Sequence, residues 1–135
     1  MDIGLLEQSI IRVDGNAEDT LAESLMLAQI AEEIRYSRIW VSEHHDSEAI
    51  AGSSPEVLLS AIGAATNTIR LGSGGIMLPH YSAFKVAENF ALLSNLYPGR
   101  VELGVGRAPG ADFKTAIALA TDGNPKFERF PDLVR

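Results

Sequence analysis

The segment TNTIRLGSGGIMLPHYSAFKVAENFALLSNLYPGRVELGVGRAPG, residues 66–110, contains one complete strand–helix–strand unit. Residues 69–73 and 101–105 are short apolar runs of the kind that form strands. Between them, Ser82 is a suitable N-cap, and the Pro-Gly pair at 98–99 ends a helical stretch. Such a unit places its two strands parallel in one sheet, with the helix packed on the sheet.

The same pattern extends toward the N-terminus. Apolar runs at residues 3–6 and 38–41 precede the unit, so the four predicted strands begin at positions 3, 38, 69 and 101. The offsets between them are 35, 31 and 32 residues, which is the length of a βα unit. The sequence therefore predicts an α/β fold with a parallel sheet. No linker divides residues 1–135, which we interpret as one domain or part of one.

The predicted helices have their own start signals and apolar stripes. Thr20 and Glu23 form a capping box, which predicts the start of the first helix, and Pro55 suits the first turn of the second. The positions predicted to be buried in the first and third helices are Leu27, Ile30, Ala31, Ile34, Val86, Phe90, Leu93 and Tyr97. After residue 110 the pattern weakens, which predicts a loop and then the first turn of another helix.

Composition excludes several classes of function. The 11 basic residues are outnumbered by 18 acidic ones and form no cluster, so neither nucleic acid nor a membrane surface is an expected partner. The chain has no cysteine, which excludes disulfides and thiol catalysis. No stretch resembles a signal peptide or a membrane span, and we therefore expect a cytoplasmic protein.

Unusual polar and glycine residues follow three of the predicted strands. Glu43, His44 and His45 come directly after the second strand, residues 72–81 continue the third, and residues 104–110 continue the fourth. Loops at the carboxyl ends of parallel strands meet at one edge of the sheet, where ligands bind in strand–helix proteins. The sequence therefore predicts a functional site at this edge.

Each cluster also has a simpler interpretation. Adjacent histidines point in different directions, so one of them could only pack or cap the loop. A metal site formed by Glu43, one of these histidines and His80 is conceivable, although the usual ligand spacings are absent. Arg107 could bind a phosphate through its guanidinium or form only a surface salt bridge. The glycines of residues 104–110 match a dinucleotide-binding fingerprint poorly.

The motifs IWVSEHH, RLGSGG, PGR and GRAPG, in this order, resemble those of the bacterial luciferase-like flavin-dependent monooxygenases. The likeness runs from about residue 3 to residue 110. It implies a (β/α)8 TIM barrel that binds FMN at its carboxyl mouth. It also implies that reduced FMN, usually supplied by a separate reductase, reacts with O2 to oxidise a small organic substrate. A deazaflavin, which some relatives use, is the alternative cofactor.

The resemblance also implies roles for particular residues. His44 matches the catalytic histidine, while Glu43 and His45 would orient it or shape the pocket. The residues expected to bind the cofactor are Ser73, Gly74, Gly75, Gly106 and Arg107, with Arg107 at the flavin phosphate. A cis peptide bond is expected between Gly74 and Gly75, and no metal is expected.

The chain is too short for a closed barrel, which takes about 250 residues, so it would form only the first four βα units, a half barrel. Two open sheet edges invite pairing, which predicts a homo-oligomer, most simply a two-fold dimer. Two alternatives to an active monooxygenase remain: a non-catalytic flavin-binding or structural half barrel, and a metal-dependent enzyme that uses the histidines.

Overall fold

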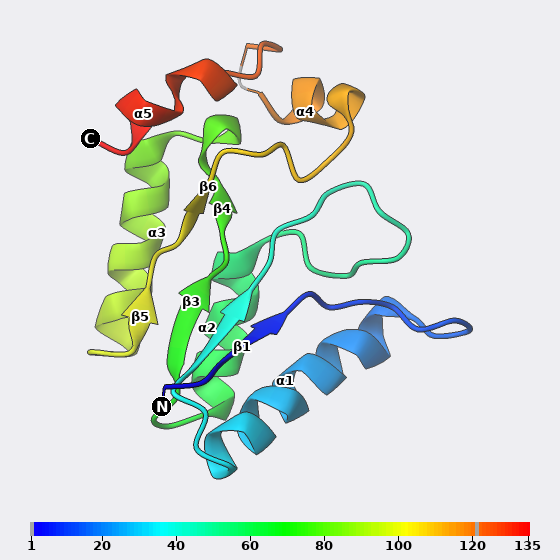
Figure 1. The fold of residues 1–135 in the computed structure, drawn as a ribbon, viewed down its shortest axis with the longest axis vertical. Coiled ribbons are helices and arrows are strands. Elements are labelled where there is room, and N and C mark those ends of the chain that lie inside the picture. The colour runs from blue at the N-terminus through cyan, green and yellow to red at the C-terminus, as the bar shows by residue number, and fades with distance from the viewer. Residues whose placement is uncertain (1, 121) are drawn as a thin grey trace.

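The computed structural model describes residues 2–120 and 122–135 and confirms the parallel sheet. The strands lie in the order β1 (Gly4–Glu7), β2 (Arg38–Val41), β3 (Arg70–Ser73) and β5 (Val101–Glu102), and each neighbouring pair is parallel (Figure 1). Beyond β3 and β5, the short strands β4 (Ile76–Met77) and β6 (Val105–Gly106) form a second parallel pair.

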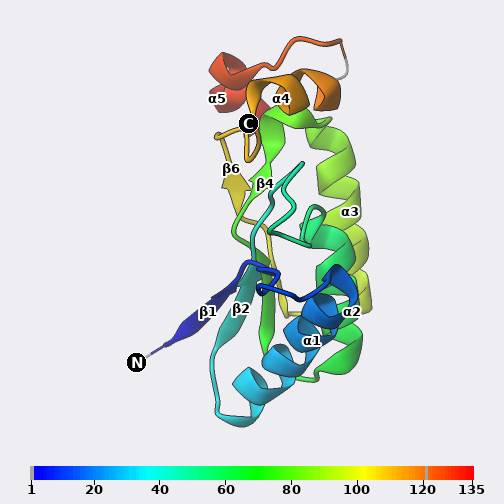
Figure 2. The same cartoon turned by 90° about the vertical axis from the view of Figure 1, so that its right-hand side faces the viewer.

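The three long helices cover one face of the sheet, as Figure 2 shows. They are α1 (Ala17–Glu33), α2 (Pro55–Ala65) and α3 (Ala83–Leu96). The shorter elements, η1 (Leu78–His80), α4 (Phe113–Leu119), η2 (Phe127–Arg129) and α5 (Phe130–Leu133), lie toward the carboxyl ends of the strands. Among the described residues no helix covers the other face, and none of the helices has the length and apolar character needed to cross a membrane.

The core lies between the sheet and these three helices. The strand register aligns Leu5, Ile39, Leu71 and Val101 in one row across the sheet. Ile39 and Leu71 are completely buried, as are Leu59 and Ile62 of α2. From α3, the predicted positions Val86, Phe90 and Leu93 are buried as expected.

The first helix begins one turn earlier than predicted. Asn16 is the N-cap, because its Oδ1 atom accepts a hydrogen bond from the Asp19 backbone N–H at 2.9 Å. Thr20, the expected cap, lies inside the first turn, and its hydroxyl donates to the Asn16 carbonyl. The predicted starts of the other two helices are confirmed: Pro55 is the first residue of α2, and the Ser82 hydroxyl caps α3.

The predicted buried stripe of α1 is wrong at two positions. Ile30 and Ile34 are 45% and 63% exposed, while small side chains, Ser24, Ala28 and Ala31, form the buried face. Small residues let the helix approach the layer beneath it closely, which turns the larger side chains outward. Ile30 lines an open groove of about 470 Å³ beside β1.

The predicted fourth strand, residues 101–105, is divided into β5 and β6. Gly104 lies at the break, and a Cβ atom there would overlap the backbone oxygen of Ser73. The break therefore depends on a close approach of two backbone segments that only glycine permits. The structure also contains α4, which the sequence pattern did not predict, and α5, which agrees with the predicted last helical turn.

Candidate functional site

The three unusual loops meet at one rim of the sheet, which confirms that expectation. The His45 backbone N–H donates to the Gly110 carbonyl at 2.9 Å, so the loop after β2 contacts the loop after β6. The Met77 backbone N–H donates to Glu43 Oε2 at 2.9 Å, and His80 Nε2 lies 2.7 Å from the Pro109 carbonyl. Direct hydrogen bonds therefore join all three loops in pairs.

Glu43 is the centre of this rim. Its side chain is completely buried. Its Oε1 atom accepts from the Tyr81 hydroxyl at 2.7 Å and lies 2.7 Å from His45 Nε2. Burial, together with the Glu43 hydrogen bond and charge, raises the pKa of Tyr81 well above its ordinary value, so Tyr81 remains a neutral donor.

The two adjacent histidines diverge, as their sequence positions predict. The His45 ring points into the network, and its side chain is only 11% exposed. His44 is half-buried; its backbone N–H donates to the Gly52 carbonyl, and its ring forms no hydrogen bond with any residue that the structure describes. Glu43 therefore holds the ring of His45 rather than that of His44. The His44 ring is the one left free for chemistry.

The peptide bond between Gly74 and Gly75 is cis, in agreement with the resemblance. Both glycines are half-buried and present bare backbone at the rim. A Cβ atom on Gly75 would lie 2.9 Å from the Gly104 carbonyl oxygen, so this bend also packs against the break before β6. Ser73 secures that contact, because its buried hydroxyl donates to the Gly104 carbonyl at 2.8 Å and accepts from the Gly104 N–H at 3.0 Å.

Arg107 extends from the loop after β6 and is exposed. Its Nε atom donates to the Phe127 carbonyl at 3.2 Å, which fixes the side chain. No carboxylate among the described residues lies within salt-bridge distance of it, so its charge is available to an anion. Gly106, just before it, lies against Met77, since a Cβ atom there would approach the Met77 sulfur to 3.0 Å.

The residues proposed for a metal site are engaged elsewhere. Both oxygens of Glu43 accept hydrogen bonds, and His80 Nε2 contacts the Pro109 carbonyl. His80 is buried, and its Nδ1 atom has no partner among the residues described. Within the described parts of the chain, no cluster of three or more His, Asp or Glu side chains could hold a metal ion.

Sequence reasoning missed two residues of the rim. Tyr81 and the Met77 backbone complete the shell around Glu43, yet nothing in their spacing marks them out. The only signal was their position, inside the 72–81 stretch that follows a predicted strand.

The residues present fit a flavin: bare backbone at Gly74 and Gly75 can lie against a planar ring, and Arg107 can hold a phosphate.

Comparison with known proteins agrees with the family that the sequence motifs resemble. A sequence profile described as luciferase-like monooxygenase matches residues 1–135. The N-acetyl-S-alkylcysteine monooxygenase of Bacillus subtilis is 50% identical over 130 residues, which is 96% of this chain and 39% of that protein. The chain thus spans about 40% of the length of the curated relatives that it matches.

Two solved structures show the same fold over nearly the whole chain. The crystal structure of apo-MsnO8 is similar with a TM-score of 0.93 and 37% identity, covering 98% of this chain and 40% of that one. The oxygenating constituent of 3,6-diketocamphane monooxygenase from Pseudomonas putida, in complex with FMN, has a TM-score of 0.83 and 25% identity. That match covers 100% of this chain and 36% of the other one.

Proposed function

This chain belongs to the luciferase-like monooxygenase family, and we propose that it forms the flavin-binding part of an FMN-dependent monooxygenase. In this proposal, reduced FMN and O2 oxidise a small organic substrate at the rim formed by the three loops. The observation that carries the proposal is the convergence of His44, the Gly74–Gly75 bend and Arg107 on one rim, held there by direct hydrogen bonds between their loops.

Arg107 and the glycine bend bind and orient the cofactor in this proposal. The guanidinium of Arg107, already fixed through its Nε atom, keeps its terminal N–H groups for the flavin phosphate. Gly74 and Gly75 would present bare backbone to the ring system of the flavin. Bound reduced FMN supplies the electrons for the reaction with O2. Ser73 acts indirectly, because its buried hydroxyl positions Gly104 and so the bend.

His44 is the group that moves a proton in this proposal. The two imidazoles differ in what they can do, because the Nε2 atom of His45 is hydrogen-bonded to the buried Glu43 side chain. The ring of His44 has no such partner among the described residues and can exchange a proton with a bound molecule. Glu43 and His45 are therefore positioning residues for the loop that carries His44.

Cofactor binding can be tested directly by titrating FMN with the chain and following flavin fluorescence. We expect saturable quenching in the wild type and at least a tenfold weaker affinity for Arg107→Ala, since a charge-assisted phosphate contact contributes about 1.5–3 kcal/mol. Arg135→Ala, which removes an equal charge from an exposed C-terminal residue, should bind like the wild type. No quenching, or equal loss in both variants, would refute the proposal. The same titration with a deazaflavin decides between the two cofactors.

A flavin-binding protein without turnover is the second candidate function. It is favoured by one observation, that the chain spans about 40% of the length of the relatives that it matches. Oxidation of reduced FMN coupled to a substrate, above the rate of free flavin, separates the two. His44→Ala should abolish that coupled rate while retaining FMN binding. The separate reductase and the cytoplasmic location implied by the sequence remain predictions.

A further inference from the structure

His80 is a buried histidine to which the proposed function gives no role. It lies in η1 and is only 3% exposed. Its Nε2 atom lies 2.7 Å from the Pro109 carbonyl oxygen, and a carbonyl only accepts, so Nε2 carries a proton and donates it. Its Nδ1 atom is buried and has no partner among the described residues. Such an atom costs free energy that an apolar side chain would avoid, so packing alone does not account for a histidine here.

The side chain of His80 contacts two segments that meet at Arg107. The first is the loop that carries Arg107 itself, because Pro109 follows Arg107 by two residues. The second begins at Phe127, whose ring lies edge-on to the His80 ring, with centroids 5.7 Å apart and an interplanar angle of 83°. The Phe127 carbonyl accepts the hydrogen bond from Arg107 Nε at 3.2 Å. His80 therefore contacts both the loop that carries the guanidinium and the residue that holds it.

The segment that supplies the Phe127 carbonyl is held mainly by apolar packing. The helix α5 follows η2 directly and lies against η1, and its residues Phe130 and Leu133 pack against the core (Figure 1). Within the described residues 122–135, the bond from Arg107 is the only hydrogen bond that reaches a residue before position 120. The position of this carbonyl therefore depends on packing, and the contact with the His80 ring is part of it.

The order of Arg107 before binding matters for its affinity for an anion. Arg107 is exposed, and a long exposed side chain loses rotamer freedom when a ligand immobilises it. A side chain that is already held through Nε loses less of that freedom on binding. The terminal N–H groups then keep a fixed direction for a bidentate contact with phosphate. Residues that hold the loop and the Phe127 carbonyl in place thus contribute to binding without touching the ligand.

A role for His80 in the hydrogen-bond network of Glu43 is the alternative. The ring of His80 lies edge-on to the rings of His45 and Tyr81, with centroids 6.1 Å away in each case. However, no hydrogen bond joins His80 to this network within the described chain, because Nε2 is used by Pro109 and Nδ1 has no partner. The directed contacts of His80 lead to Arg107 instead.

We propose that His80 is a positioning residue for Arg107, which it orders for the flavin phosphate by holding the Pro109 loop and Phe127 together. This inference rests on the proposed function, since it concerns the same phosphate contact. It assigns to His80 an effect on the phosphate of the cofactor and none on the ring system. A residue with a merely structural role would affect both parts of the flavin alike.

The first test compares the affinities of FMN and riboflavin, which lacks the phosphate, by flavin fluorescence. His80→Leu removes the donor at similar size, and we expect about fivefold weaker FMN binding with unchanged riboflavin binding. His80→Gln should bind FMN like the wild type, because its amide N–H can take the place of Nε2–H. In the Arg107→Ala background, His80→Leu should cause no further loss, since both changes remove the same contact.

The second test needs no flavin. The Nε–H signal of Arg107 is followed in the 15N-labelled free protein and assigned by its absence in Arg107→Ala. We expect hydrogen exchange of this group to be about fivefold faster in His80→Leu, because its bond to the Phe127 carbonyl is loosened. Phe127→Ala keeps that carbonyl but removes the ring, and should have the same effect even if His80→Leu fails to fold. The control Phe84→Ala removes a ring that is 75% exposed on α3 and should leave the signal unchanged.

Three results would overturn the inference. One is an equal loss of FMN and riboflavin binding in His80→Leu, which would indicate a general structural role. Another is a loss in the Arg107→Ala background as large as in the wild type. The third is unchanged exchange of the Arg107 Nε–H in both His80→Leu and Phe127→Ala. If the wild type bound no FMN, the proposed function would fail, and the exchange measurement would still decide whether His80 orders Arg107.

Discussion

Glu43 Oε1 and His45 Nε2 lie 2.7 Å apart at a position where Glu43 has no exposed surface. This contact, with the hydroxyl of Tyr81, holds the loop after β2 against the segment that follows the glycine bend. A buried carboxylate is tolerated only when its oxygens are satisfied, and here every oxygen is. The three residues of the Glu-His-His motif thus have different roles. Glu43 and His45 hold the rim together through their hydrogen bonds, and the His44 ring has no such partner.

Replacing Glu43 with glutamine should destabilise the protein. An amide cannot accept all three hydrogen bonds in the same way, and we expect the free energy of unfolding to fall by about 2–3 kcal/mol. Urea denaturation at pH 7 and fixed protein concentration measures this. Glu88→Gln is the matched control, because Glu88 forms only an exposed pair with Lys85 on α3. Similar stabilities for the two variants would contradict the role of Glu43.

Glu32 should make the stability of the fold depend on pH. Partial burial raises the pKa of Glu32, but hydrogen bonds from the backbone N–H groups of Ile69, Thr68 and Asn67 lower it more, to about 2. A carboxyl group whose pKa is lowered by folding stabilises the folded state at pH values above its unfolded pKa of 4.5. This contribution is lost as the pH falls from 4.5 toward 2. We therefore expect Glu32→Gln to lose part of the acid dependence of unfolding.

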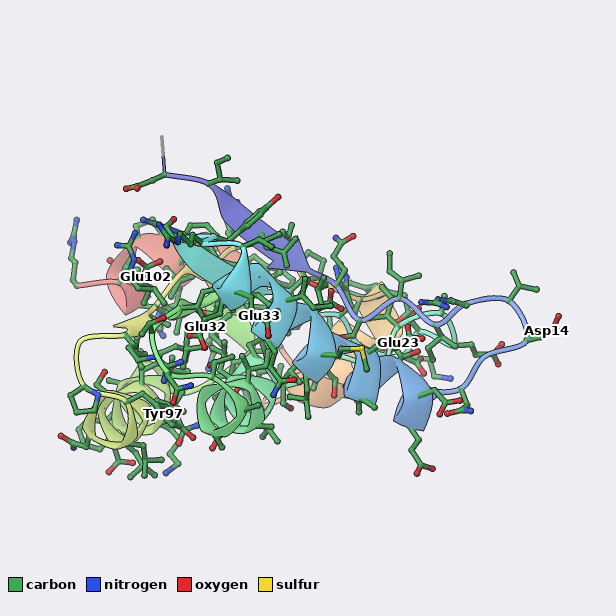
Figure 3. The ribbon with its side chains drawn as sticks, turned by 90° about the horizontal axis from the view of Figure 1, so that it is seen from below. Asp14, Glu23, Glu32, Glu33, Tyr97 and Glu102 are labelled. Carbon is green, nitrogen blue, oxygen red and sulfur yellow. The ribbon has the colours of Figure 1, made fainter. Side chains whose placement is uncertain are left out.

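The control for Glu32 is its neighbour Glu33, which is exposed; Figure 3 labels both. At pH 7 we expect Glu32→Gln to cost about 1–2 kcal/mol in the free energy of unfolding, and Glu33→Gln to change it by less than about 0.5 kcal/mol. Unfolding measured in urea between pH 3 and pH 7 gives both quantities. If the free energy of unfolding depended on pH in the same way in the wild type and in Glu32→Gln, this role of Glu32 would be ruled out.

Gly104→Ala should be among the most damaging small substitutions. Its Cβ atom would overlap the Ser73 carbonyl oxygen, which belongs to the backbone and cannot rotate away. We expect a loss of about 3 kcal/mol in the free energy of unfolding. Gly99→Ala provides the comparison: Gly99 has φ of +74° but open space around it, so only about 1 kcal/mol is expected there. A larger loss of stability for Gly99→Ala than for Gly104→Ala would contradict the close backbone approach at Gly104.

Arg100, in the Pro-Gly-Arg motif, should be irreplaceable by lysine. Its guanidinium donates to the carbonyls of Ile69 and Thr66 and to the Thr66 hydroxyl, and it lies over the ring of Tyr97. A lysine offers one point charge and cannot form this set of bonds. In thermal unfolding, we expect Arg100→Ala and Arg100→Lys each to lose about 2–4 kcal/mol in the free energy of unfolding relative to the wild type. Full stability in Arg100→Lys would contradict this.

Much of the fold was predictable because it depends on short-range signals. The spacing of apolar runs gave the parallel strands, and Pro55 and Ser82 marked two helix starts correctly. The failures lie where packing overrides local pattern. Ile30 and Ile34 fit a helical stripe, yet small side chains of α1 occupy the buried face instead. The break at Gly104 depends on a distant backbone segment, which no local pattern reveals.

The candidate site was predictable in position and less so in detail. Strand ends identified the rim, because parallel strands bring their following loops together. The partners of each side chain were not predictable, since they come from distant parts of the chain. Tyr81 reaches Glu43 from 38 residues away, and the Phe127 carbonyl fixes Arg107 from 20 residues away. The division of roles between His44 and His45 emerges only from these contacts.

The most direct measurement is the mapping of FMN onto the protein by NMR. Backbone amide shifts of the 15N-labelled chain are recorded during titration with FMN, with free riboflavin as the comparison that lacks the phosphate. We expect the largest changes at His44, Gly74–Gly75 and Arg107, and we expect riboflavin to leave the Arg107 shift unchanged. Changes confined to the helices, or spread over sites far from these three loops, would contradict a shared flavin site at the rim.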